Sequence, residues 1–196
     1  MSIFALYFEL GSEHILDYAK GYDHILFVLA LCAVYLLMDW KQILILVTAF
    51  TIGHSITLAL ATLNIITANT AWIEFLIPVT IFTTAVSNLF RKVETLSGSR
   101  VHLNYLLALF FGLIHGMAFS NYLKSLLGSQ KSITLPLFAF NLGLEAGQII
   151  IVGVFLALSF IAVNLAGVSR RDWKMVVSSA VAAIALMLMK DRIPEL

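Results

Sequence analysis

The stretch QILILVTAFTIGHSITLALATLN, residues 42–64, decides the fold class of this chain. It contains 23 residues without Asp, Glu, Lys or Arg, and its apolar positions are continuous rather than alternating as in a half-buried strand. About 20 helical residues cross a hydrocarbon core that is ~30 Å thick. Because lipid offers no partner for backbone polar groups, an isolated spanning segment must be a helix. Residues 42–64 therefore predict a transmembrane α-helix.

Five further apolar runs flank this stretch and are long enough to span a bilayer. They lie near residues 24–40, 71–90, 102–127, 134–166 and 173–190. The predicted fold class is all-α, a polytopic membrane helix bundle with six transmembrane helices. No linker or low-complexity segment interrupts the chain, so we expect residues 1–196 to form a single integral membrane domain.

Residues 1–23 differ from the predicted spans because charged side chains interrupt their apolar positions. A secretory signal has a basic start and an uninterrupted apolar centre, and this segment has neither. We therefore expect a short N-terminal interfacial helix that stays on the protein. A cleaved leader is the alternative.

The composition agrees with a membrane protein. Hydrophobic residues make up 61% of the chain and charged residues 12%, with a mean hydropathy of +0.97. A soluble domain carries about 25% charged residues. The net charge of +1 supplies no basic stripe for phosphates, which argues against a nucleic-acid partner. The expected partner is the lipid bilayer, and the single cysteine, Cys32, allows no intrachain disulfide.

The distribution of basic residues predicts the orientation. With six spans, the segments on one side carry seven basic residues, Lys41, Arg91, Lys92, Arg100, Arg170, Arg171 and Lys174. The other side carries five, Lys20, Lys124, Lys131, Lys190 and Arg192. The positive-inside rule then places both termini outside. We expect the protein in the inner (cytoplasmic) membrane of a bacterium.

Ionisable side chains lie inside the predicted spans, where they are costly and mark a pathway or a site. With a rise of 1.5 Å per residue, His54 and His115 lie about 12 Å and about 10 Å below the outer boundary. By the same measure Glu145 lies ~15 Å deep, and His24 is nearer the outer surface. Four helices thus bring imidazole or carboxylate groups to one layer in the outer half of the membrane.

This layer predicts a transition-metal site, because imidazole and carboxylate groups bind nickel, zinc, copper and iron. The predicted metal ligands are His24, His54, His115, Glu145 and Asp23. Residues expected to guide the ion or to orient its ligands are His14, Asp17, Asn141, Gln148 and Ser55. In the structural alternative each histidine is a neutral core residue bonded to a neighbouring carbonyl or hydroxyl, Glu145 is protonated or paired, and Asp23 caps a helix.

Two glycine motifs flank the buried ionisable groups. His115 lies between Gly112 and Gly116, and Glu145 lies between Gly143 and Gly147. G-x-x-x-G spacing allows helix backbones to approach closely. We therefore expect the fourth and fifth spans to pack tightly against each other where their polar side chains lie.

Four motifs together resemble the HupE/UreJ family of small membrane proteins over nearly the whole chain. They are GYDHILF at 21–27, AFTIGHSITL at 49–58, FGLIHGMAF at 111–119 and FNLGLEAGQ at 140–148. The resemblance implies nickel uptake, and it matches Asp23-His24 and His115-Gly116 to family motifs. Two positions depart from nickel-associated members. Asp17 stands where they have a histidine, and residues 120–122 replace a Gly-x-Glu, which is typical of a divergent branch.

We therefore predict a transition-metal permease or uptake facilitator, with nickel implied by the resemblance and zinc, copper or iron as alternatives. An intramembrane metal-dependent hydrolase or other metalloenzyme is the alternative function, with Glu145 as general base beside a metal-bound water. A metal-binding accessory or redox subunit is the third. The inner half offers mainly Asn88 and hydroxyl groups, so no route through the membrane is visible in the sequence. Whether the chain forms a homo-oligomer stays open.

Overall fold

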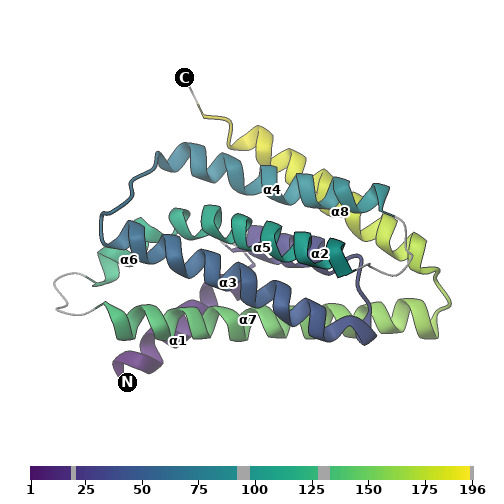
Figure 1. Cartoon of the computed structure of the whole chain (residues 1–196), viewed down its shortest axis with the longest axis horizontal. Coiled ribbons are helices and arrows are strands. Elements are labelled where there is room, and N and C mark those ends of the chain that lie inside the picture. The colour runs from purple at the N-terminus through teal and green to yellow at the C-terminus, as the bar shows by residue number, and fades with distance from the viewer. Residues whose placement is uncertain (19–20, 92–97, 128–132, 195–196) are drawn as a thin grey trace.

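The computed structural model describes residues 1–18, 21–91, 98–127 and 133–194, and every regular element in these ranges is a helix. Figure 1 shows the helices lying mostly along one long axis. Their bounds are α1 Ile3–Leu16, α2 Tyr22–Cys32, η1 Leu37–Asp39, α3 Trp40–Thr62, α4 Thr70–Phe90, α5 Gly98–Ala118, α6 Ser120–Leu127, α7 Thr134–Phe160, η2 Ile161–Leu165 and α8 Arg170–Asp191. The predicted all-α class is confirmed.

Within the described residues, four helical segments are long and apolar enough to cross a membrane: Leu37–Thr62, Thr70–Phe90, Thr134–Leu165 and Arg170–Asp191. The pair His102–Ala118 and Ser120–Leu127, bent by 50°, makes a fifth if it is counted as one span. The remaining predicted span, 24–40, overlaps the shorter apolar helix α2, which has 11 residues and begins at Tyr22. The count of six therefore stays a prediction.

Large apolar side chains face outward along the long helices, as expected for contact with lipid. On α3 they include Ile45, Ile52 and Ile56, and on α7 they include Ile150 and Val154. In a soluble protein a patch of this extent would mark an interface. Together with the apolar length of the helices, the exposed apolar faces are those of a membrane helix bundle.

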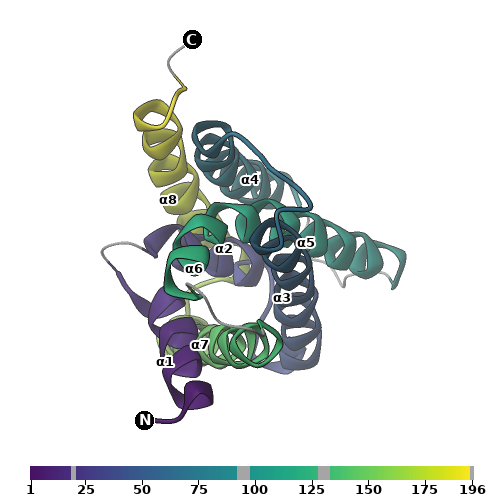
Figure 2. The ribbon, with the colours of Figure 1, turned by 90° about the vertical axis from the view of Figure 1, so that its left-hand side faces the viewer.

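Helix α2 lies at the centre of the bundle. In the end-on view of Figure 2 the other helices surround it, and most of its side chains are buried, including Asp23 and His24. It packs against α4, α7 and α8. The central position explains why a helix too short to span alone is apolar on nearly every side.

Glycines allow α3 and α5 to pack closely against each other. A Cβ on Gly53 would overlap the carbonyl oxygen of Leu109, and a Cβ on Gly112 would overlap that of Phe50. Only a hydrogen at these positions lets the two backbones come together. The pairing brings the segment that carries His54 beside the segment that carries His115.

The second glycine motif joins α7 to α1. A Cβ on Gly143 would overlap the carbonyl oxygen of Phe8, and one on Gly147 would overlap the side chain of Ile15. The prediction that the fourth and fifth spans pack tightly against each other is therefore wrong. Each motif does allow close approach, but the partners are α3 and α1. A G-x-x-x-G spacing shows that one face of a helix allows close packing, but it does not show which helix packs there.

Helix α1 follows the first half of α7 and ends where the chain turns back towards α2. Gly21 sits in this turn, where a Cβ would overlap the carbonyl oxygen of His14. The Gly21 N–H donates to the carbonyl of Asp17 at 2.7 Å. The prediction of an interfacial helix over residues 1–23 stays a prediction. Of the basic residues used for the orientation, Lys20, Lys92 and Lys131 lie outside the described residues.

Candidate metal site

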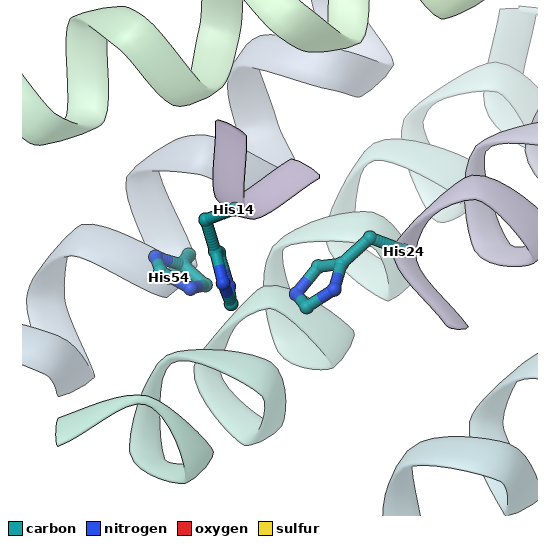
Figure 3. A group of neighbouring side chains, drawn as sticks. All are labelled: His14, His24 and His54. Atoms are coloured by element: carbon teal, nitrogen blue, oxygen red, sulfur yellow. The ribbon is translucent and has the colours of Figure 1, made fainter. Parts of the chain in front are cut away.

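Three histidines from three helices meet in the interior of the bundle. His14 comes from α1, His24 from α2 and His54 from α3, and Figure 3 shows the His14 ring between the other two. One ring nitrogen from each residue can be chosen so that all three lie within 4.8 Å of one another. The ring centroids of His14 and His24 are 4.6 Å apart, and those of His14 and His54 are 6.3 Å apart. Three imidazoles at these distances have the donor type and spacing of a metal site.

One nitrogen of each ring in this group, Nε2, is buried and makes no hydrogen bond inside the protein. His54 is 0% exposed and His24 is 6% exposed. Nε2 of His14, Nε2 of His24 and both ring nitrogens of His54 are buried and make no hydrogen bond. Buried polar atoms in native proteins are nearly always satisfied. Several unsatisfied nitrogens aimed at one point indicate a ligand that accepts their lone pairs.

His115 on α5 stands next to the three-histidine group. Its ring centroid lies 5.3 Å from that of His24, and its Nε2 lies 3.4 Å from the hydroxyl of Thr80 on α4. Its Nδ1 is buried without a hydrogen bond. The structure thus brings the three histidines of the predicted layer together. His115 lies on the side of the group that faces Thr80 of α4.

Asp23 lies behind His24 rather than among the ring nitrogens of the group. Its Oδ1 is 2.9 Å from Nδ1 of His24, and its Oδ2 accepts a hydrogen bond of 3.1 Å from Arg192. A carboxylate on one imidazole nitrogen fixes the ring and leaves the other nitrogen to bind a metal. In this geometry Asp23 orients His24, and Arg192 in turn orients Asp23.

Glu145 and Gln148 are directed to α3 and not to the histidines. The hydroxyl of Thr48 donates to Oε1 of Glu145 at 2.6 Å, and that of Thr51 donates to Oε1 of Gln148 at 2.9 Å. Both residues do share one face of α7, as their spacing predicts. That face serves helix pairing, and Ser55, which donates to the carbonyl of Thr51 at 2.6 Å, belongs to the same polar seam.

Asn141 is the polar residue of α7 that reaches the histidine group. It interacts with His54. Its Nδ2 donates to the carbonyl of Leu137 at 2.8 Å, while its Oδ1 is buried without a partner. Asn141 lies near the histidines, whereas Glu145, one helical turn further along α7, bonds to Thr48 of α3.

A cavity of about 410 Å³ opens beside the group. Its lining residues are Leu10, Glu13, His14, Asp17, Phe119 and Tyr122. His14 belongs both to this cavity and to the histidine group, so it stands between the two. The carboxylates of Glu13 and Asp17 give the cavity a negative lining, which raises the local concentration of cations.

The sequence placed His14 outside the site as a guiding residue, and the structure places it within the group. The signal that could have found it is Gly21, because a tight turn at this position brings the end of α1 beside the start of α2. His102 is exposed near the start of α5, where its ring lies 6.3 Å from that of Tyr105. It takes no part in the group.

Comparison with known proteins gives one match. The HupE/UreJ protein family matches residues 1–192, nearly the whole chain. No match was found among curated proteins or among solved structures. The extent of the match agrees with the four motifs, which are distributed from residue 21 to residue 148. The chain therefore belongs to the HupE/UreJ family, a membrane-associated family related to the transport of nickel or cobalt.

Proposed function

We propose that this protein is a transition-metal permease or uptake facilitator that binds its ion through His14, His24 and His54. The observation that carries the proposal is the meeting of three imidazoles, each with a buried Nε2 that makes no hydrogen bond. The family supplies the class of substrate, a transition metal. Nickel is our choice among these metals because the family is related to nickel or cobalt transport, and imidazole ligands suit nickel.

The charge around the proposed ligands suits an ion that must leave again. Neutral imidazoles add no negative charge, and the charge of Asp23 is shared with Arg192. A dipositive ion is therefore held by donor strength more than by charge. Conduction needs a site that binds well enough to select an ion and weakly enough to release it. A site that also contained Glu145 would hold the ion more firmly.

The ion would approach through the cavity lined by Glu13 and Asp17. Its carboxylates attract the hydrated cation, and His14 at the inner wall is the first imidazole the ion meets. Ring nitrogens replace the water ligands of the ion one after another. The ion is therefore never without ligands in an apolar environment, where an unsolvated charge is costly. In this sequence Asp17 attracts the cation first, and His14 then becomes its first imidazole ligand.

We further propose six crossings in a single domain, with α1 and α2 forming the first crossing in series. The N- and C-terminal ends lie towards the same end of the bundle in Figure 1, which fits an even number of crossings. The positive-inside rule would place that end outside the inner membrane. Interrupted helices of this kind place binding groups near the middle of many transporters.

The test uses the full chain in proteoliposomes with radiolabelled Ni²⁺. His14→Ala, His24→Ala and His54→Ala are expected to lose most Ni²⁺ binding and uptake, while the control His102→Ala keeps both. Unchanged Ni²⁺ binding in all three variants would overturn the site. A metal that co-purifies with the protein and does not exchange with added Ni²⁺ would overturn transport, since conduction requires release.

A further inference from the structure

A second cavity lies in the opposite half of the bundle, between α2, α4 and α5. Its volume is about 100 Å³. Apolar side chains line much of it, and its polar lining residues include Tyr35, Thr84, Ser87, Asn88, Arg91 and Asn104. None of these is a histidine or a carboxylate. Among the described residues, its polar lining therefore offers hydroxyl and amide groups and the guanidinium of Arg91.

A stripe of oxygen atoms on α4 connects this cavity with the histidines. Thr80 lies beside His115, and the hydroxyl of Thr84 donates to the carbonyl of Thr80 at 2.8 Å. Thr80, Thr84 and Asn88 are four residues apart, so they share one face of the helix. Eight residues at 1.5 Å each cover about 12 Å. The stripe thus runs from the histidine layer to the far wall of the cavity.

Hydrogen bonds join three of the residues that line this cavity. Nη2 of Arg91 donates to Oδ1 of Asn104 at 2.9 Å, and Nδ2 of Asn104 donates to the hydroxyl of Tyr35 at 3.0 Å. The bonds join the end of α4 to α5 and to the segment after α2. Lys174 of α8 donates to the carbonyl of Arg91 and fixes the backbone there. We name Arg91, Asn104 and Tyr35 the latch.

We propose that this cavity is a second cation site, from which the metal ion is released, and that the latch closes its mouth. The inference rests on the proposed transport function. Neutral oxygen donors suit a nickel-like ion less well than imidazole does, so an ion that passes from His115 to Thr84 and Asn88 is held more weakly. A guanidinium at the mouth repels a dication and also blocks its path.

The latch has to open before an ion can leave, because Arg91 lines the cavity and is bonded across it. With the latch closed, cations from the far side meet a positive charge first. With Arg91 turned away from Asn104, the cavity would be open to that side. The two halves of the pathway then differ in donor chemistry, nitrogen in one and oxygen in the other.

The experiment measures ⁶³Ni²⁺ uptake and equilibrium Ni²⁺ binding of the full chain in proteoliposomes. Arg91→Gln removes the charge at the mouth. We expect about tenfold faster uptake, the change that follows when a charge-assisted hydrogen bond no longer holds the closed state. Ni²⁺ binding at the histidines should stay unchanged. Arg171→Gln is the matched control, because Arg171 is exposed in the first turn of α8 and does not line the cavity.

Two further variants keep the test decisive if Arg91→Gln folds poorly. Tyr35→Phe removes only the hydroxyl that accepts from Asn104 and should also speed uptake, by a smaller factor. Thr84→Val removes an oxygen from the stripe and should slow uptake at least severalfold without changing binding. Thr134→Val, at an exposed position at the start of α7, is its control.

The outcomes separate this inference from the proposed function. If wild type takes up Ni²⁺ and His54→Ala does not, while the latch and stripe variants all behave as wild type, the second site is wrong and transport stands. Slower uptake in Arg91→Gln with unchanged binding would also overturn the latch. If wild type neither binds nor moves Ni²⁺, the proposed function itself fails.

Discussion

Gly116 packs against His54 so closely that a Cβ at position 116 would overlap both the His54 carbonyl oxygen and the Thr57 hydroxyl. This contact joins α5, which carries His115, to α3 at the residue that supplies one of the three clustered imidazoles. The geometry of the three-histidine group therefore depends on a glycine outside that group. The atoms in the way are mainly backbone, so they cannot move aside at low cost.

Gly116→Ala is expected to destabilise the protein and to weaken Ni²⁺ binding, because α3 and α5 must separate. Overpacking of this kind costs about 1–3 kcal/mol. Thermal unfolding in detergent and Ni²⁺ titration measure the two effects. The matched control is Gly153→Ala on α7, where a Cβ meets nothing within 4 Å. Helix propensity predicts no loss of stability there. Equal behaviour of the two variants would contradict the packing account.

Glu145→Gln is expected to leave Ni²⁺ affinity within about twofold of wild type. A glutamine side-chain oxygen can still accept from Thr48, so the α3–α7 contact survives, and the carboxylate does not belong to the three-histidine group. His54→Ala in the same titration should lose at least about tenfold, as the loss of a ligand requires. Similar losses of Ni²⁺ affinity in both variants would indicate that Glu145 is a metal ligand.

Asp23→Asn is expected to lower Ni²⁺ affinity by about 10–100-fold, although Asp23 is placed behind a ligand. The variant removes the charge that orients His24 and that pairs with Arg192, and outer partners of metal-bound histidines have effects of this size. Asp191→Asn, exposed at the end of α8, is the control. An affinity equal to that of wild type would show that His24 needs no carboxylate to be held in place.

The double variant Glu13→Gln, Asp17→Asn is expected to slow Ni²⁺ association severalfold at low ionic strength, with less effect on the dissociation rate. The reason is long-range attraction into the cavity, which salt screens over about 10 Å at 0.1 M. Stopped-flow binding at two salt concentrations measures it. Glu9→Gln, an exposed change on α1 outside that cavity, should behave as wild type. A defect that persists at high salt would instead indicate direct ligation.

The sequence by itself determined the class of fold and the kind of chemistry. Apolar length and the absence of charge over residues 42–64 are local properties, and in lipid they leave the backbone no alternative to a helix. Depth is also nearly local, because the rise per residue is constant. That is why His54 and His115 could be placed in one layer, and the structure does set both beside His24.

Only the tertiary structure decided which faces meet. Spacing placed Asn141 and Glu145 on the same side of one helix, yet Asn141 reaches His54 and Glu145 bonds to Thr48. The turn at Gly21 brought His14 into the site. The glycine motif of α5 packs against α3, and that of α7 packs against α1. Helix rotation and pairing depend on contacts between segments far apart in the chain. A periodic pattern cannot specify them, because it records the shape of one face and not the identity of its neighbour.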